Sequence, residues 1–172
     1  MTSDGAVDDA KRVLRALMRQ VRAVIAADAH DRQRRSEEIC AAVIGSVESR
    51  FTDLGSLHAL LYDPLVGEPD LTALAARFAA NNVETYVPEI DGDSLRVMPG
   101  DADPRLLDVV VVPGLAFTPS GARLGQGGGH FDRFLTRLGE GCLRIGVAFH
   151  EQVVAELPTA DHDVAVDVVI TA

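Results

Sequence analysis

Apolar residues in the first third of the chain recur at the three- and four-residue spacing of amphipathic helices. The first run predicts a helix from Val7 to Ala27 with its arginines on the outer face. Its apolar positions are Val7, Leu14, Leu17, Val21, Val24 and Ile25. A second run, which opens at or near Ser36, predicts another helix through Ile39, Val43, Ile44 and Val47. The chain therefore begins with two consecutive helices.

Short apolar runs alternate with helical patterns along the rest of the chain. Strands are predicted at 57–62, 83–90, 94–98, 106–114, 142–149 and 164–171, and helices at 71–82, 130–141 and 151–157. The clearest strand contains four consecutive valines at 109–112, which is typical of a strand covered on both faces. This order predicts an α/β fold: a single three-layer domain, residues 1–172, with a mainly parallel sheet flanked by helices in a Rossmann-like arrangement.

Composition and charge narrow the class of protein. The 172 residues contain no apolar run of membrane-spanning length and no basic, then apolar, signal at the N-terminus, so we expect a soluble, cytoplasmic protein without a membrane partner. The net charge of −10 argues against nucleic-acid binding through a basic face. The basic residues are fifteen arginines and one lysine, Lys11, and nine of these sixteen lie in residues 1–50. Cys40 and Cys142 are expected to be small buried side chains.

The segment 121–135, GARLGQGGGHFDRFL, follows the valine strand and contains five glycines within nine positions. Ligands of open α/β sheets bind at the carboxyl ends of strands, and glycines let several N–H groups converge on an anion. A helix that starts near His130 would add its free N–H groups, and Arg123 a charged donor. The spacing matches no standard nucleotide fingerprint, so a purely structural turn remains the alternative to a phosphate site.

Two carboxylates accompany this segment. Asp132 lies at the predicted helix start, where it would either cap N–H groups or help to bind Mg²⁺, which prefers one or two carboxylates together with phosphate oxygens. Asp163, before the last strand, is a second candidate ligand of Mg²⁺. The neighbouring His162 is expected to be a surface residue, because magnesium takes oxygen ligands.

Four segments resemble the 5-formyltetrahydrofolate cyclo-ligase (methenyltetrahydrofolate synthetase) family. They are KRVLR (11–15), YDPLVGEPDLTAL (62–74), VVVVPGLAFTPSGARLGQGGGHFDRFL (109–135) and LPTADHDVAVDVVIT (157–171). The third is long and specific, and the others occur in the family's order. The resemblance implies a ligase that cyclises 5-formyltetrahydrofolate to 5,10-methenyltetrahydrofolate, with ATP as co-substrate and Mg²⁺, and that releases ADP and phosphate. It also implies a phosphorylated formyl intermediate.

The resemblance also implies roles for individual residues. Lys11 and Arg123 would be catalytic and would bind ATP. The other residues expected to bind ATP are Arg15, Leu124, Gly125, Gln126, Gly127, Gly128, Gly129, His130 and Phe131. Tyr62, Glu68 and Gln126 would bind the folate, with Glu68 on the pterin, and Asp132 and Asp163 would bind Mg²⁺. The expected partners are the small-molecule substrates, folate and ATP. The protein is expected to be a monomer or a weak homo-oligomer.

Two departures from the family pattern leave a second hypothesis open. Gln126, His130 and Phe131 replace aromatic residues that usually surround the glycines, and PGDADPR (99–105) replaces a longer segment near the nucleotide. A divergent relative that binds nucleotide or folate without turnover, as a regulatory or partner-binding domain, would tolerate both changes. The enzyme is favoured by the joint presence of five charged residues, because a relative that only binds its ligand needs no such set. These residues are Lys11, Glu68, Arg123, Asp132 and Asp163.

Overall fold

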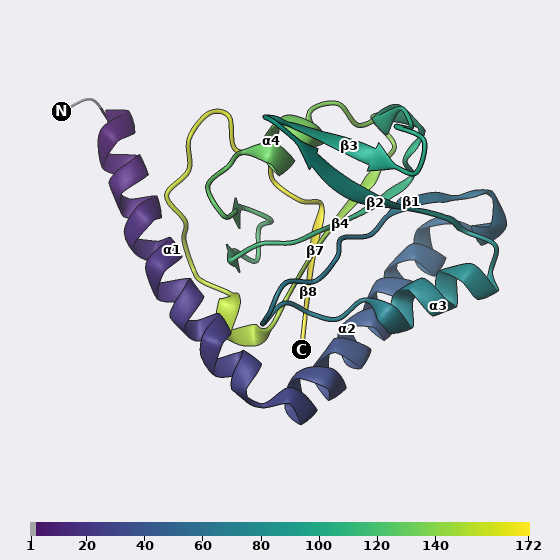
Figure 1. The fold of residues 1–172 in the computed structure, drawn as a ribbon, viewed down its shortest axis with the longest axis horizontal. Helices are drawn as coiled ribbons and strands as arrows, with labels where there is room; N and C mark the ends of the chain where they lie inside the picture. The colour runs from purple at the N-terminus through teal and green to yellow at the C-terminus, as the bar shows by residue number, and fades with distance from the viewer. Residues whose placement is uncertain (1–2) are drawn as a thin grey trace.

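Residues 3–172 of the computed structural model form a six-stranded sheet flanked by helices (Figure 1). Four α-helices are present in this range: α1 (Ser3–Ala27), α2 (Ala29–Arg50), α3 (Thr72–Ala80) and α4 (His130–Leu135). The strands of the sheet are β1 (His58–Leu60), β2 (Glu84–Asp91), β3 (Ser94–Met98), β4 (Val109–Val112), β7 (Leu143–Ala148) and β8 (Val168–Thr171). The predicted three-layer α/β fold with a mainly parallel sheet is confirmed.

The order of the strands across the sheet is β3-β2-β1-β4-β7-β8. All neighbours pair in parallel except β3, which returns antiparallel to β2 at the edge. In the centre, β1 pairs with β4 through Ala59 opposite Val109 and Leu60 opposite Val110. The chain leaves β1 toward β2 and leaves β4 toward β7, so the connections diverge between these two strands. Such a switch point opens a crevice at the carboxyl ends of the strands.

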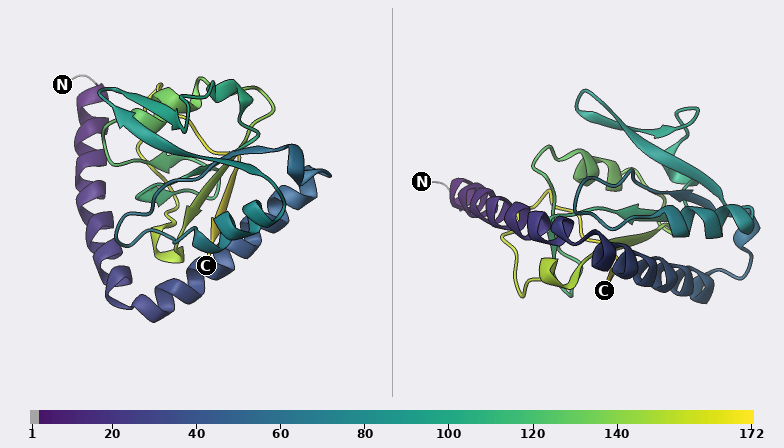
Figure 2. Two further views of the ribbon diagram at one scale, coloured as in Figure 1. Left: turned by 45° about the vertical axis from the view of Figure 1, so that its right-hand side comes forward. Right: turned by 60° about the horizontal axis from the view of Figure 1, so that its bottom comes forward.

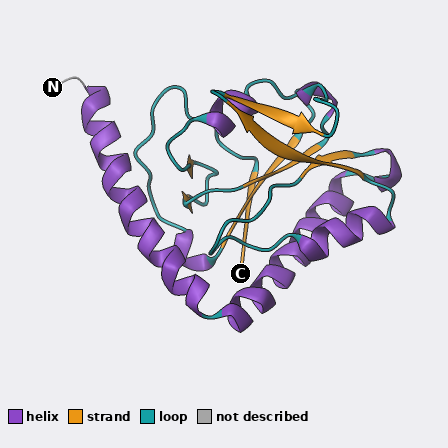
Figure 3. Cartoon of the chain, in the orientation of Figure 1, coloured by secondary structure: helices purple, strands orange, loops and turns teal. Residues whose placement is uncertain are grey.

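The valine strand shows why this sheet needs helices on both faces. Val109 and Val111 pack with residues of α2 and α3, whereas Val110 and Val112 pack on the opposite side with residues that include Phe134 of α4. All four valines are fully buried. Because successive side chains of a strand point to opposite faces, a continuous apolar run requires two covering layers. Figure 3 shows the strands between these helical layers.

The inner face of α1 differs from the predicted one. Leu17 and Val24, predicted to face the core, are 51% and 74% exposed. Ile25 is buried as predicted, but the other buried positions are Met18 and two cations, Lys11 and Arg22 (Figure 1 shows α1 along one side of the molecule). The prediction that the arginines line the outer face is therefore wrong for Arg22. The carboxylates of Asp163 and Glu68, on the body of the protein, pair with Lys11 and Arg22.

The second helix begins earlier than the apolar pattern predicted. Asp28 caps α2 by accepting a hydrogen bond from the Asp31 amide at 2.9 Å. Ser36 lies inside the helix, where its hydroxyl donates to the Arg32 carbonyl and accepts from the Asp70 amide. The first two turns of α2 are polar, so a prediction that relied on apolar periodicity did not detect where the helix begins.

The C-terminal third contains three corrections to the predicted elements. The helix predicted at 151–157 is only a 3₁₀ turn, His150–Gln152, because the buried Gln152 side chain donates to the carbonyls of Gly114 and Leu115. The helix predicted at 130–141 ends at Leu135. The strand predicted at 164–171 starts at Val168.

Two antiparallel ribbons shape the edge of the molecule near the glycine segment. Ala116–Phe117 (β5) and Arg123–Leu124 (β6) form a small one that the sequence did not predict. The other, β2 with β3, projects from the sheet (Figure 2). Among the helices of residues 3–172, none is long and apolar enough to cross a membrane.

Candidate functional site

The residues predicted to form a site converge at the carboxyl ends of β1 and β4. Tyr62 and Glu68 follow β1, and Arg123 comes from β6 beyond β4. Asp132 lies in α4, and Asp163 in the segment before β8. This is the crevice that the strand order creates, and helix α1 runs beside it.

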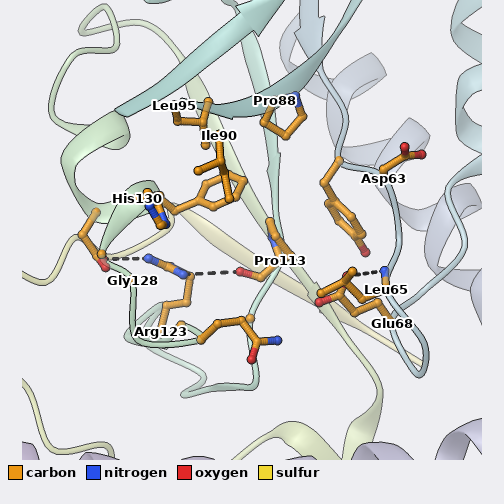
Figure 4. Close-up of a pocket in the computed structure, with 17 residues that line it drawn as sticks. Asp63, Leu65, Glu68, Pro88, Ile90, Leu95, Pro113, Arg123, Gly128 and His130 are labelled. Carbon is orange, nitrogen blue, oxygen red and sulfur yellow. Dashed lines mark hydrogen bonds and ion pairs between the residues drawn. The ribbon is translucent and has the colours of Figure 1, made fainter. Parts of the chain in front are cut away.

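A cavity of about 250 Å³ occupies one half of this crevice (Figure 4). Its walls are largely apolar, with a buried carboxylate, Glu68, on one side and the guanidinium of Arg123 on the other. The remaining lining residues are Tyr62, Asp63, Leu65, Pro88, Ile90, Leu95, Pro113, Gly114, Gly125, Gln126, Gly128, Gly129, His130, Phe131 and Asp132. We call this space the apolar cavity.

A second, strongly charged cavity of about 420 Å³ adjoins it on the side of α1. It is lined by Asp8, Asp9, Lys11, Arg12, Arg15, Arg123, Leu124, Gly125, Gly127, Gly129, Asp132, His162 and Asp163. We call this space the charged cavity. Four residues line both cavities: Arg123, Gly125, Gly129 and Asp132. A ligand in one cavity can therefore reach a ligand in the other at Arg123 and Asp132.

Arg123 and Asp132 form a buried ion pair at this shared wall. Nη2 of Arg123 donates to Oδ1 of Asp132 at 2.7 Å, and the same oxygen accepts from the Val164 amide at 3.3 Å. The guanidinium also lies 5.8 Å from the ring centre of Phe131, and its buried Nε has no hydrogen-bond partner within the described chain. Because a buried unpaired donor is costly, this nitrogen favours an acceptor supplied by a ligand.

Lys11 and Asp163 form a second ion pair in the charged cavity. Nζ of Lys11 lies 2.7 Å from Oδ1 and 2.5 Å from Oδ2 of Asp163, which also accepts from the Ala160 amide. Burial raises the pKa of Asp163, but the Lys11 ammonium and the Ala160 amide outweigh burial, so the pKa lies below its usual value. The Asp163 carboxylate is therefore ionised at neutral pH.

The glycine loop between β6 and α4 presents free backbone donors. In the described chain, the amides of residues 126–129 donate no backbone hydrogen bond. The carbonyls of Gly125 and Gln126 accept from Arg15 and Arg19 of α1 at 3.1 and 3.2 Å, which fixes the loop against the helix. Gly127 has φ +113°, a conformation that favours glycine. The predicted turn and the predicted anion site are thus compatible in one loop.

Glu68 is held rigidly at the far end of the apolar cavity. Its Oε1 lies 3.1 Å from Nη1 of Arg22, and its Oε2 accepts from the Leu65 amide at 2.9 Å. The Tyr62 hydroxyl donates to the Pro69 carbonyl, and burial, followed by the nearby negative charge of Glu68, raises the pKa of Tyr62. The carboxylate therefore faces the cavity from a fixed position.

The other predicted residues also reach the site. Leu124 is buried in β6, and Gln126, Gly128 and Phe131 line the apolar cavity. The His130 ring lies 3.3 Å from the Gly92 carbonyl, which joins the glycine loop to the β2–β3 ribbon. Exposed His162 matches its prediction as a surface residue. Both cysteines are buried as predicted, and burial raises the pKa of Cys142 to about 12, so this thiol is inert.

Asp132 does not cap α4, contrary to one of the two sequence hypotheses. In the described chain, its carboxylate accepts from Arg123 and Val164 rather than from amides of its own helix. Within residues 3–172, no three His, Cys, Asp or Glu side chains form a ready-made metal site. Asp132 and Asp163 nevertheless line the same charged cavity. Two carboxylates without a third ligand fit a cation that takes its remaining ligands from phosphates and water.

The predictions from sequence assigned no role to several residues that build the site. Arg22 was missed, although it follows Lys11 by 11 residues, or about three helical turns, which places both on one face of α1. The ribbon residues Pro88, Ile90 and Leu95 form a wall of the apolar cavity (Figure 4). Nothing in their local pattern distinguishes them from ordinary strand residues.

Comparisons with known proteins give one consistent result. Residues 96–172 match the model of the 5-formyltetrahydrofolate cyclo-ligase family. A 5-formyltetrahydrofolate cyclo-ligase from Saccharomyces cerevisiae is 39% identical over 71 residues, which are 38% of this chain and 34% of that protein. The one from Mycolicibacterium smegmatis is 42% identical over 64 residues, 37% of this chain and 33% of that protein. These sequence matches thus span about a third of the length of the curated relatives.

Solved structures extend the similarity to nearly the whole chain. The 5,10-methenyltetrahydrofolate synthetase from Aquifex aeolicus has a TM-score of 0.75 and 30% identity, covering 94% of this chain and 89% of that one. The 5,10-methenyltetrahydrofolate synthetase from Mycoplasma pneumoniae has a TM-score of 0.81, with 93% of this chain and 97% of that one covered. At 22% identity, this second likeness establishes the fold alone.

Proposed function

Because the chain belongs to the 5-formyltetrahydrofolate cyclo-ligase family, we propose that it converts 5-formyltetrahydrofolate and ATP to 5,10-methenyltetrahydrofolate, ADP and phosphate. One observation carries the proposal: an apolar cavity with a buried carboxylate and a charged cavity meet at a shared wall formed by Arg123 and Asp132. The first suits a flat heteroaromatic ring system with N–H donors, and the second suits a triphosphate. A two-substrate transfer needs this kind of contact between its binding sites.

The charged cavity is the proposed nucleotide site. Lys11 and Arg15 lie one helical turn apart and would bind phosphate oxygens from α1. The free amides of 126–129 would bind phosphates from the opposite side, with Leu124, Gly125, His130 and Phe131 as neighbouring parts of the loop. Asp132 and Asp163 would hold Mg²⁺, which supplies neutralisation of phosphate charge when bound. Lys11 and Arg123 would then turn from these carboxylates to the phosphates.

The apolar cavity is the proposed folate site. Glu68 would accept hydrogen bonds from the donor edge of the pterin, and Tyr62 and Gln126 would contact the ring system. In this orientation the N5 formyl group approaches Arg123. The site is lined mainly by side chains without nucleophilic groups, so we assign to the protein positioning and charge stabilisation rather than covalent catalysis.

The proposed reaction proceeds in two steps. The formyl oxygen attacks the γ-phosphorus, the bond from phosphorus to the β–γ bridging oxygen breaks, and ADP leaves. N10 then attacks the activated formyl carbon, loses its proton, and phosphate departs as the C–O bond breaks. Arg123 lies where negative charge passes between the two substrates and would stabilise it in both steps.

Product formation tests this proposal directly. Purified protein with 5-formyltetrahydrofolate and MgATP should give methenyltetrahydrofolate, detected by its absorbance, together with stoichiometric ADP. Omission of ATP or chelation of magnesium should abolish the product. Binding of both ligands without product at high protein concentration would instead identify a non-catalytic relative.

We also propose that the chain acts as one domain, residues 1–172, in the cytoplasm, as a monomer or weak homo-oligomer without nucleic-acid or membrane partners. The net charge of −10 supports the exclusion of nucleic acid.

A further inference from the structure

Arg22 of α1 contacts Glu68 without itself lining the apolar cavity. Its Nη1 lies 3.1 Å from Glu68 Oε1, and its Nη2 donates to the Val66 carbonyl at 3.0 Å. Both charged side chains are almost fully buried, at 7% and 5% exposure. In the described chain, the residues that line the two cavities do not include Arg22. Any effect of Arg22 on a ligand must therefore pass through Glu68 or its turn.

The turn that bears Glu68 is built around this arginine. Gly67 has φ +79°, and a Cβ added to it would lie 2.6 Å from the backbone oxygen of Arg22. The side chains of Leu65 and Val66 are 58% and 85% exposed, so they contribute little packing that could hold the turn. The orientation of the carboxylate is thus determined by polar contacts. These are the contacts of Arg22 and the hydrogen bond that the Leu65 amide donates to Glu68 Oε2.

We propose that Arg22 is the positioning residue of the folate site, and that it fixes the Glu68 carboxylate so that its free lone pairs meet an amino-pyrimidine edge with paired N–H donors. This inference rests on the proposed function. One guanidinium binds a carboxylate and a carbonyl at once because its nitrogens lie in a rigid plane. A lysine ammonium at this position would retain the charge but lose the planar pair of contacts.

Calorimetric binding of 5-formyltetrahydrofolate and of MgATP, measured separately, tests this role. Arg22→Met should raise the folate dissociation constant about 10- to 100-fold, the range for hydrogen bonds to charged groups. MgATP affinity should change less than about 2-fold, since Arg22 lies outside the charged cavity. Arg22→Lys should fall between wild type and Arg22→Met. The matched control is Arg34→Met, because Arg34 also pairs with carboxylates, Asp31 and Glu38, but on the exposed surface.

A double-mutant cycle separates positioning from general destabilisation. In a Glu68→Gln background, Arg22→Met should weaken folate binding by less than about 2-fold, because its effect acts through Glu68. If Arg22→Met does not fold, Arg22→Lys decides, with weaker folate binding and unchanged MgATP binding expected. If the Arg22 variants bind folate with wild-type affinity while Glu68→Gln binds it more weakly, the role of Arg22 is overturned but the proposed function is not. A wild-type chain that binds no folate overturns the proposed function as well.

Discussion

The two cavities place their buried cations differently relative to the ligand. In the charged cavity, Lys11 and Asp163 both line the cavity, as do Arg123 and Asp132. In the apolar cavity, Glu68 lines the cavity but its partner Arg22 lies behind it. One face of α1 supplies a cation to each arrangement, because Lys11 and Arg22 are about three turns apart.

This difference indicates which ion pairs a ligand could separate by inserting between the two partners. In the proposed function, a phosphate and a divalent cation would insert between Lys11 and Asp163, since each would find an opposite charge in the same cavity. The pair of Arg22 and Glu68 offers no such entry, so it is suited to hold one carboxylate in a constant orientation. The charged cavity is therefore suited to adapt to its ligands, whereas the apolar cavity holds its carboxylate in a preorganised position.

The largest expected effect is on turnover, through loss of a cation in the charged half. Lys11→Ala should lower the rate of methenyltetrahydrofolate formation by about 10²- to 10³-fold, the usual loss for one transition-state donor. Folate affinity should stay within about 2-fold of wild type if the halves are independent. Steady-state kinetics and calorimetry would measure both, with the surface variant Arg34→Ala as control. Normal turnover with an unchanged KM for ATP would contradict the nucleotide assignment.

The next effect concerns stability and its dependence on pH. Asp163→Asn leaves the buried Lys11 without its counter-charge and should lower the free energy of unfolding by about 1–3 kcal/mol at pH 7. Since the pKa of Asp163 is lowered on folding, its contribution is complete above the unfolded value of about 4 and disappears as pH falls through the folded value. Urea unfolding of the wild type and of Asp163→Asn should show that the gap between their free energies of unfolding narrows as the pH falls. A gap independent of pH would show that the ion pair is not its cause.

The smallest effect probes the wall of the apolar cavity. Ile90→Ala should raise the KM for folate about 3- to 10-fold through lost apolar contact, and should change the free energy of unfolding by less than about 0.5 kcal/mol because Ile90 is exposed. Val87→Ala is the matched control, since Val87 is exposed on the same strand but does not line the cavity. Equal KM values in the two variants would remove Ile90 from the folate site.

Some residues of the site could be predicted from the sequence and others could not. The resemblance to the family pointed to Lys11, Arg15 and the loop 125–129, because its motifs lie close together in the chain. Arg22 and Ile90 could not be predicted, because their importance depends on contacts with distant segments. Some helix boundaries were predicted wrongly for the same reason. The buried Gln152 amide donates to the Gly114 carbonyl in the loop after β4, and only a 3₁₀ turn forms where a helix was predicted.

By itself, the sequence determined the alternation of helices and strands, the doubly covered valine strand 109–112 and the presence of a charged glycine-rich segment. These follow from local periodicity and backbone freedom. Only the tertiary structure decided which cations on α1 turn inward, which carboxylates they meet, and that the two cavities share Arg123 and Asp132. The physical reason is that burial and ion pairing are properties of packed neighbours. The hydrogen-bond partners of Arg22 and Lys11, Val66 and Asp163, lie 44 and 152 residues away along the chain.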